Sequence, residues 1–203
     1  MPTPLHTERL DAVHDALRAL GARRIADLGC GDGDFLIRLA QDEAIEHITG
    51  VEISRARLDA LAARLAQAGP DAQARVTLRH DTLIEAGRWI GEADCVVMVE
   101  VIEHLAPAEL GRLERRILHE ARPPALILTT PNAEYNARLG VPDHRFRHPE
   151  HRFEWSRAQF RDWARRVARR AGYGAGFQDM GGVDPDIGGA SQMAILIRQG
   201  KRD

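Results

Sequence analysis

Two carboxylates and three histidines are the residues of this 203-residue chain best suited to chemistry. Glu100, Glu103 and His104 form a Glu-x-x-Glu-His stretch directly after an apolar run, and His148 and His151 lie in a second stretch. Two neighbouring carboxylates repel each other unless a cation lies between them. A mixture of carboxylate and imidazole groups suits Mg²⁺, Mn²⁺ or a similar divalent ion. The pattern therefore indicates a divalent-metal site.

The second histidine-containing stretch is the least expected part of the chain. It reads Arg-His-Pro-Glu-His-Arg-Phe-Glu-Trp-Ser-Arg over residues 147–157. A single histidine in a loop is usually a surface residue, but two within four positions are more typical of a functional segment. One of them could supply the remaining ligand of the site that begins at Glu100. If a helical turn begins at Glu100, the side chains at 100, 103 and 104 share one face of it.

A glycine-rich loop points to a cofactor of the nucleotide type. Gly29 and Gly31 lie between a predicted strand and a predicted helix, where glycine lets the backbone turn sharply and approach a ligand. Asp32 and Asp34 flank the loop and would repel a pyrophosphate, so they favour a cofactor that has a positive end and no phosphate. Glu52 begins the next unit and could bind both ribose hydroxyls. S-adenosylmethionine fits this combination.

Strand-like and helix-like segments alternate along the chain, which predicts an α/β fold whose mostly parallel sheet has helices on both faces. The predicted helices lie at 7–20, through 35–39, after Ser54, at about 107–121 and from Ser156. The seven predicted strands lie at 24–28, 48–53, 75–80, 94–99, 124–130, 173–180 and 191–198. Residues 131–155 have no clean period, and long irregular segments inside compact domains are often functional. We expect one methyltransferase-type domain over 1–203, with 131–155 as an inserted His/Arg-rich active-site segment.

The glycine loop resembles the first motif of class I, Rossmann-like methyltransferases, and the order of strands and helices agrees over nearly the whole chain. The later motifs are more specific. Glu-x-x-Glu-His, then Thr-Pro-Asn-Ala-Glu-Tyr-Asn at 130–136, then His-Arg-Phe-Glu-Trp-Ser-Arg-Ala-Gln-Phe at 151–160 resemble the small-RNA 3′-terminal 2′-O-methyltransferase family. This resemblance covers about residues 24–198, and the bacterial relatives in this family act in RNA repair.

The resemblance implies a function: metal-dependent transfer of a methyl group from S-adenosylmethionine to the 2′-hydroxyl of the 3′-terminal nucleotide of RNA. It implies Mg²⁺ or Mn²⁺ at four ligands, which are Glu100, Glu103, His104 and His151. It implies a cofactor site formed by Asp27, Gly29, Gly31, Glu52, Asp81 and Thr82. His148 has a counterpart in some members of the family, so we expect it to support catalysis, by contacting the terminal nucleotide or by accepting a proton.

Three positions depart from the family pattern. Glu150 replaces the aspartate that usually precedes the metal-binding histidine, Ser156 replaces a threonine, and Asp81 replaces a glycine. None of these changes removes a proposed ligand. The chain also lacks the extra N-terminal region of many bacterial relatives, so we expect an RNA-repair partner protein or an activating domain in trans.

Charge is distributed unevenly along the chain. The net charge is −2, yet residues 138–170 contain ten arginines and four acidic residues. Such a segment could bind the phosphates at an RNA 3′ end, although a solvated helix face gives the same composition. No apolar run approaches the ~20 residues of a membrane span, so we expect no membrane partner. The absence of a secretory signal pattern and the two isolated cysteines lead us to expect a cytoplasmic protein.

Two other functions fit parts of the pattern. A quinone- or phenol-type small-molecule O-methyltransferase would share the glycine loop, and many such enzymes have a Glu-x-x-x-His-like stretch without a metal. It would not need the His/Arg-rich insertion. A binding subunit that kept the fold and lost the chemistry is the second alternative, and the intact Glu100, Glu103, His104 and His151 argue against it.

Overall fold

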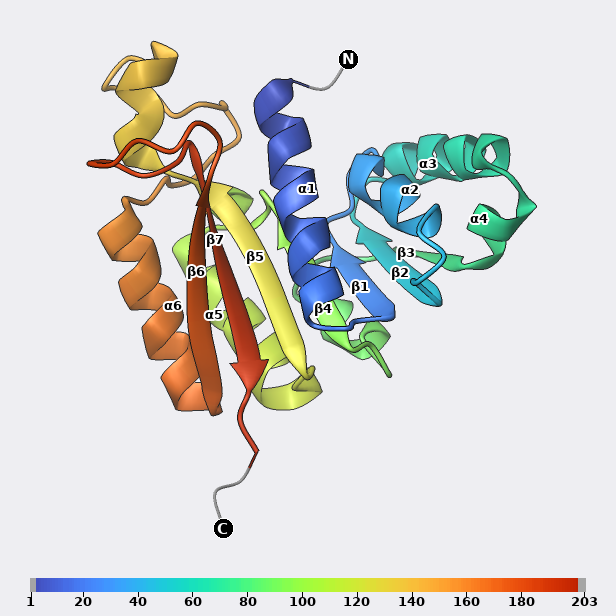
Figure 1. The fold of residues 1–203 in the computed structure, drawn as a ribbon. Coiled ribbons are helices and arrows are strands. Elements are labelled where there is room, and N and C mark those ends of the chain that lie inside the picture. Colours follow the sequence, from blue (N-terminus) through green and yellow to red (C-terminus); the bar gives the residue numbers. More distant parts are fainter. Residues whose placement is uncertain (1–2, 201–203) are drawn as a thin grey trace.

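The computed structural model of the chain describes residues 3–200. Its centre is a sheet with the strand order β3-β2-β1-β4-β5-β7-β6 (Figure 1). β7 runs antiparallel to β5 and β6, and the remaining neighbours pair in parallel. The strands are β1 (Arg24–Leu28), β2 (His47–Glu52), β3 (Val76–His80), β4 (Cys95–Val99), β5 (Ala125–Pro131), β6 (Tyr173–Met180) and β7 (Ser191–Arg198). The predicted seven-stranded, mostly parallel α/β fold is confirmed.

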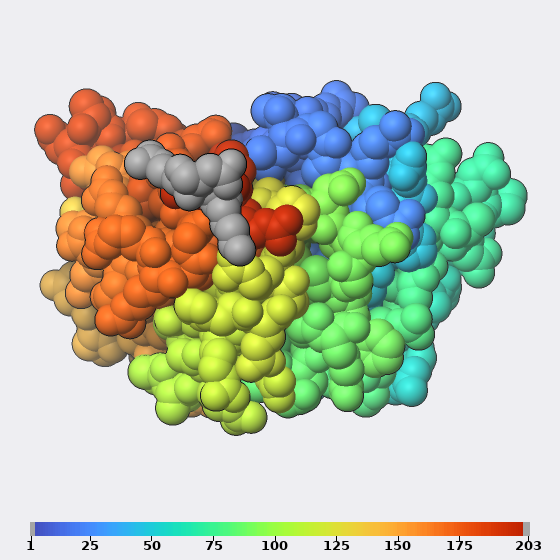
Figure 2. Space-filling view, turned by 90° about the horizontal axis from the view of Figure 1, so that it is seen from below, coloured from blue at the N-terminus to red at the C-terminus, as the bar shows by residue number. Residues whose placement is uncertain are grey.

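Helices cover both faces of the sheet, as the alternation of the sequence predicts. The structure has α1 (Pro4–Ala19), α2 (Asp34–Ala40), α3 (Arg55–Ala68), α4 (Pro70–Ala74), α5 (Pro107–Glu114) and α6 (Arg157–Ala171). Apolar side chains of α1 to α4 form one core cluster, and those of α5 and α6 belong to the other. Seen from below, the blue N-terminal part of the chain and the yellow-green part that follows α5 lie on opposite sides of the molecule (Figure 2).

Helix starts follow the local signals in the sequence. The Ser54 side chain accepts a hydrogen bond from the backbone N–H of Arg57 and caps α3. Ser156 Oγ accepts the N–H of Gln159, whose side chain accepts the N–H of Ser156, so the predicted capping box begins α6. The predicted helix over 107–121 is α5 followed by a π-helical stretch, η3 (Arg115–Ala121).

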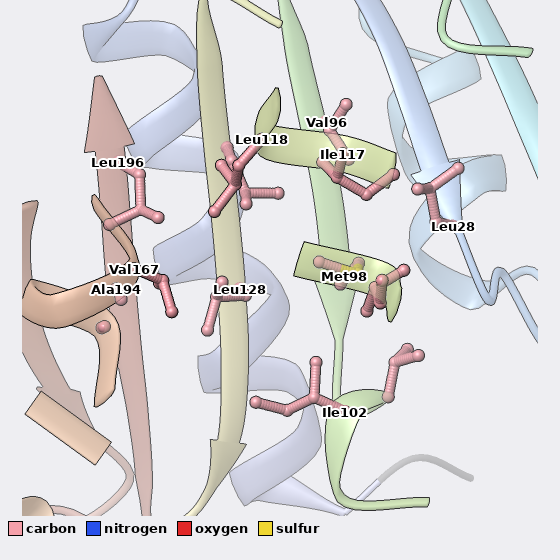
Figure 3. Packing of buried hydrophobic residues seen from close by; sticks show 14 of the residues in the cluster. Leu28, Val96, Met98, Ile102, Ile117, Leu118, Leu128, Val167, Ala194 and Leu196 are labelled. Carbon is pink, nitrogen blue, oxygen red and sulfur yellow. The ribbon is translucent and has the colours of Figure 1, made fainter. Parts of the chain in front are cut away.

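The core on the α5–α6 side of the sheet fixes the two central strands. Met98 of β4 and Leu128 of β5 pack with Leu196 of β7, Ile117 of η3 and Val167 of α6 (Figure 3). Every residue of β5 is buried, and so are the first four of β4. Rigid central strands hold whatever side chains follow their carboxyl ends, and ligands of α/β sheets bind at that edge.

The irregular segment predicted at 131–155 contains a single 3₁₀ stretch, η4 (Ala133–Leu139), within the described residues. It lies beyond the carboxyl end of β5, near the start of α6 (Figure 1). The extent of the domain at 1–203 stays a prediction, since residues 1, 2 and 201–203 lie outside the described part. Between residues 3 and 200, no helix combines the length and apolar character needed to cross a membrane.

Candidate active site

A cavity of about 540 Å³ opens at the carboxyl ends of β1, β2, β3 and β4. A second cavity of about 220 Å³ lies beside it and shares Gly29, Arg57 and Glu100 with it. The larger cavity is lined by residues from all three predicted motifs, among them Glu52, Asp81, Thr82, His104 and Glu150. The cofactor and metal predictions therefore converge on one edge of the sheet.

The glycine loop forms the boundary between the two cavities. Gly29 has a φ of 80°, and a Cβ built there would lie 2.9 Å from the Cγ2 of Val101, so only glycine fits without a shift. The Gly31 N–H donates to Glu52 Oε2 at 3.1 Å, and Ser54 N–H donates to Glu52 Oε1 at 2.9 Å. These two donors hold the Glu52 carboxylate at the end of β2, at the edge of the larger cavity.

Asp27 is buried at the base of the smaller cavity. Burial, followed by the charge of Glu52, raises its pKa from 3.8 to about 7. A buried carboxyl group with such a pKa is stabilised in its ionised form by a nearby positive group. The smaller cavity is also lined by Gly31, Asp32 and Asp34, so its wall suits the positive end of a ligand.

Asp81 and Thr82 follow β3 and line the larger cavity, as predicted. The Asp81 carboxylate is already engaged: Oδ2 accepts hydrogen bonds from Arg88 and from Trp89 Nε1, and Oδ1 accepts the Thr82 N–H. Although burial opposes ionisation, these hydrogen bonds lower the pKa of Asp81. Asp81 thus fixes the loop that forms this wall, and its direct contact with a cofactor stays a prediction.

Glu100 lies just beyond β4 in a left-handed backbone conformation, with a φ of 55°. No helical turn begins at Glu100, so the condition under which residues 100, 103 and 104 would share one helical face is not met; the 3₁₀ turn η2 spans Ile102–His104. The carboxylate instead accepts a hydrogen bond from Thr129 Oγ1 at 2.9 Å and pairs with Arg9 Nε at 3.2 Å. Glu100 therefore points back to the sheet and to α1, because the left-handed residue separates it from the turn that follows.

Glu103 is fully buried, with 0% of its surface exposed. Its Oε2 accepts a hydrogen bond from Thr130 Oγ1 at 3.1 Å, and its Oε1 has no partner in the described structure. Burial, and then the negative charge of Glu100, raise the pKa of Glu103 well above its usual range. A buried carboxylate oxygen without a partner is costly unless a cation or a donor occupies the space beside it.

The three histidines of the two motifs come together. Nitrogen atoms of His104, His148 and His151 all lie within 4.8 Å of one another. The ring centroids of His104 and His151 are 4.9 Å apart, and His148 lies 5.9 Å and 5.6 Å from them. Among the described residues, neither Glu100 nor Glu103 joins this group. The four-ligand assignment to Glu100, Glu103, His104 and His151 therefore stays a prediction.

His151 is oriented by a buried carboxylate. Its Nδ1 lies 2.5 Å from Glu154 Oε1, and the two side chains are 7% and 1% exposed. Glu154 also accepts hydrogen bonds from the Arg147 N–H at 2.7 Å and from Asn136 Nδ2 at 2.6 Å. The hydrogen bonds from His151, Asn136 and Arg147 lower the pKa of Glu154 although burial opposes them. This arrangement fixes the His151 ring and leaves its Nε2 free to bind a ligand.

Polar contacts attach the inserted segment to the rest of the site. Arg152 N–H donates to the Glu103 carbonyl at 2.7 Å, which joins the segment to the turn that contains Glu103 and His104. The guanidinium of Arg147 donates to the backbone carbonyls of Asn132 and Ala190. The two histidine-containing motifs are thereby held against each other, although they are more than forty residues apart in the sequence.

Sequence reasoning missed several residues of this site. Arg9, Thr129, Arg147 and Glu154 were given no role there, and Thr130 was quoted only as part of a motif. Thr129 and Thr130 end a buried strand beside the predicted site, which was a usable signal. The sequence around Arg9 contains no such signal, because its partner Glu100 lies far away in the sequence.

The Arg-rich segment divides into two kinds of residue. Arg147 is engaged internally, and Arg138, Arg157, Arg161 and Arg165 pair with acidic side chains. The others are exposed and form no ion pair within the part of the chain that the structure describes. They are Arg145, Arg152, Arg166, Arg169 and Arg170.

Comparison with known proteins identifies the family. The methyltransferase-domain family matches residues 26–123. The solved methyltransferase domain of the bacterial protein CtHen1 is 34% identical, with a TM-score of 0.86, over 97% of this chain and 100% of that one.

The chain belongs to the small RNA 2′-O-methyltransferase family. The Small RNA 2′-O-methyltransferase of Gallus gallus is 31% identical over 97% of this chain and 54% of its own length. That of Arabidopsis thaliana is also 31% identical, over 97% of this chain and 23% of its own length. The chain thus spans about half or less of these two relatives, and what it shares with them is the class I methyltransferase domain.

Proposed function

We propose that this member of the small RNA 2′-O-methyltransferase family transfers a methyl group from S-adenosylmethionine to the 2′-hydroxyl of the 3′-terminal nucleotide of RNA, and that it uses Mg²⁺ or Mn²⁺. The observation that supports this most is the convergence of His104, His148 and His151 beside a turn that holds the buried Glu103. Family membership supports methyl transfer to RNA. The two adjoining cavities supply room for a cofactor next to the histidines.

The residues present fit a divalent ion. The unpartnered Oε1 of Glu103 and the imidazole nitrogens are oxygen and nitrogen donors of the kind that Mn²⁺ and related ions accept. A positive charge there would also relieve the repulsion between Glu100 and Glu103. In the bound state such an ion lowers the pKa of a hydroxyl that contacts it and makes that hydroxyl a better nucleophile.

The chain's own residues then bind and orient the reactants. The acidic wall of the smaller cavity suits the positive end of S-adenosylmethionine, and Glu52 faces the space expected for the ribose. In the transfer, the methyl carbon leaves the sulfonium sulfur and bonds to the 2′ oxygen. The hydroxyl proton passes to a neutral base nearby. Desolvation and the neighbouring histidines lower the pKa of His104, which favours the neutral ring that can bind a metal or accept a proton.

A 3′-terminal preference follows from the chemistry of the proposed metal site. A site that binds adjacent 2′ and 3′ hydroxyls together requires both to be free, and it needs no contact with the base. The exposed arginines of the 138–170 segment, such as Arg145 and Arg152, are available to bind the last phosphates.

One assay separates this proposal from its alternatives. Labelled S-adenosylmethionine is incubated with the protein and with three RNAs that end in free 2′ and 3′ hydroxyls, in a 2′-deoxy sugar, or in a 3′-phosphate. We expect label only in the first RNA and only when Mn²⁺ or Mg²⁺ is present. Equal label in all three RNAs contradicts terminal recognition, and label in a hydrophobic phenol alone favours the small-molecule enzyme. Failure to bind the cofactor at all favours the binding subunit.

A further inference from the structure

His6 lies in the first turn of α1 and lines the smaller cavity. Its Nε2 is buried and makes no hydrogen bond within residues 3–200. Asp34 Oδ2 lies 3.5 Å from this nitrogen, while Arg64 binds the other oxygen of that carboxylate at 2.7 Å. A buried nitrogen without a partner costs stability unless a ligand supplies an acceptor, so this atom is a candidate contact for whatever fills the cavity.

The charges around the smaller cavity are unbalanced. Four carboxyl groups line it, and the only nitrogen-bearing side chains in its described lining are those of His6 and Arg57. The amino-acid end of S-adenosylmethionine has an ammonium group and a carboxylate. The acidic wall attracts the ammonium and the sulfonium, but it repels the carboxylate unless a donor offsets the repulsion. The four carboxyl groups belong to Asp27, Asp32, Asp34 and Glu100.

Of the two side chains that could donate to this carboxylate, His6 is the better placed. Arg57 lines both cavities, its side chain is 52% exposed, and its Nε lies 3.7 Å from Asp32 Oδ1. Its charge is therefore divided between solvent and another carboxylate. His6 lines the smaller cavity alone, and its Nε2 is shielded from water. A hydrogen bond to a charged group is stronger where solvent is excluded, so we expect the anionic group of the ligand at His6.

We propose that His6 is a cofactor-binding residue whose Nε2–H donates to the carboxylate of the amino-acid end of S-adenosylmethionine. The neighbouring Asp34 Oδ2 favours the tautomer that carries the proton on Nε2. A neutral imidazole in that tautomer is already a donor, so the contact does not require a protonated ring. The inference rests on the use of S-adenosylmethionine in the proposed function, and it involves neither the RNA nor the metal.

Three ligands that differ at the amino-acid end test this inference without any methyl transfer. They are S-adenosylmethionine, decarboxylated S-adenosylmethionine, which lacks only the carboxylate, and 5′-methylthioadenosine, which lacks the whole amino-acid chain. Calorimetry measures the affinity of each for the purified full chain, for His6→Ala and for His6→Phe, which keeps an aromatic ring but removes the donor. The matched control is His144→Ala, which removes an exposed histidine outside both cavities. Circular dichroism checks that the variants are folded.

We expect both His6 variants to bind S-adenosylmethionine about tenfold more weakly than the unmodified chain, because they lose a hydrogen bond to a charged group. Their affinity for decarboxylated S-adenosylmethionine and for 5′-methylthioadenosine should change less than about twofold, and His144→Ala should match the unmodified chain throughout. Unchanged affinity for S-adenosylmethionine in His6→Phe would overturn the inference. An equal loss for ligands with and without the carboxylate would also overturn it, since His6 would then only pack α1 against the cavity.

The outcome is distinguishable from a failure of the proposed function. If the His6 variants lose affinity only for the ligand with a carboxylate, but the unmodified chain methylates no RNA, the role of His6 stands and the proposed function falls. If RNA with a free 3′ end is methylated and His6→Phe binds S-adenosylmethionine as tightly as the unmodified chain, the function stands and the role of His6 falls.

Discussion

The two halves of the candidate site are positioned by different kinds of interaction. The cofactor half lies on the ends of β1, β2 and β3, where the sheet and the glycine loop place Glu52 and Asp27 through the backbone. The half proposed to bind a metal, called the metal half below, depends on an irregular segment that polar side chains hold in place, chiefly Arg147 and Glu154. Backbone positioning tolerates changes of side chain, whereas a network of buried polar groups fails when one member is lost. We therefore expect the two halves to respond to mutation in different ways.

The largest effect is expected from removing His151, one of the proposed metal ligands. His151→Ala should lower the rate of methyl transfer about a thousandfold, because a metal site supplies several kcal/mol to the transition state. The affinity for S-adenosylmethionine should change less than about threefold, since the cofactor half is positioned independently. Calorimetric cofactor titration and single-turnover rates measure the two effects, with His144→Ala as the control. Unchanged turnover in His151→Ala would contradict the metal assignment.

A smaller effect is expected from the carboxylate that orients that ligand. Glu154→Gln keeps the size of the side chain but weakens the hydrogen bond to His151 Nδ1. Metal affinity should fall about 10- to 100-fold, as it does when outer partners of metal-binding histidines are changed. Dialysis against Mn²⁺ measures this affinity. If Glu154→Gln binds Mn²⁺ as tightly as the unmodified chain, the polar network is not what orients His151.

The cofactor half should show its dependence on pH through Asp27. Its pKa of about 7 means that the carboxyl group is mostly protonated at pH 6 and mostly ionised at pH 8. The ionised form attracts the positive end of S-adenosylmethionine, so affinity should rise with pH through 7 and level off above it, by up to about tenfold. Asp27→Asn removes this ionisation, and calorimetry at pH 6, 7 and 8 compares the two proteins. The same pH dependence in Asp27→Asn would exclude Asp27 as its source.

The same ionisation of Asp27 should lower the stability of the folded protein as the pH rises, whereas it should raise the affinity for the cofactor. Asp27 has a folded pKa above its unfolded value of 3.8, so the folded state binds more protons between these two values. The contribution to stability is therefore full below about pH 4 and is lost as the pH rises to about 7. Urea unfolding at pH 5 and pH 8 should show a decrease in the free energy of unfolding that is smaller in Asp27→Asn, while the buried Glu103, whose pKa is also raised, contributes to the decrease in both proteins.

The smallest effect on the candidate site is expected from a substitution at Ser156, where the irregular segment ends and α6 begins. Ser156→Ala removes the side chain that caps α6, which should lower the free energy of unfolding by about 1 kcal/mol. The histidine group lies before the cap, so Mn²⁺ affinity should hardly change. Urea unfolding measures the first quantity and dialysis the second. A loss of Mn²⁺ affinity as large as that of Glu154→Gln would show that the helix, and not the polar network, positions the segment.

The regular half of the molecule could be predicted from the sequence almost residue by residue. The strands at 24–28, 173–180 and 191–198 have the predicted bounds, because apolar runs and glycines are local signals. The capping box at Ser156 is another local signal. The placement of Glu52 and Glu100 at the same edge of the sheet followed from the order of the strands.

The irregular half could be predicted only as a set of candidate residues. Whether a helical turn begins at Glu100 could not be decided from the sequence, because this left-handed residue contacts Arg9 and Thr129, which are far away in the sequence. The hydrogen bonds of Arg147 to backbone carbonyls could not be predicted either. The sequence shows an arginine in a charged segment, and it does not show whether that arginine faces solvent or the interior. The conformation of the irregular half depends on contacts between residues that are far apart in the sequence. Such contacts leave no periodic pattern in the sequence from which they could be predicted.

The left-handed backbone of Glu100 has a consequence for how such a protein can evolve. An L-residue with a long side chain adopts this conformation at a cost of about 1–2 kcal/mol, and glycine would remove that cost. Arg9 would still be held by the Ser191 hydroxyl after such a change. Arg9 would nevertheless lose its carboxylate partner, and a buried guanidinium without such a partner is costly. Drift to glycine would thus relax the backbone and at the same time leave a buried cation unpaired, so the structure itself opposes the replacement of Glu100.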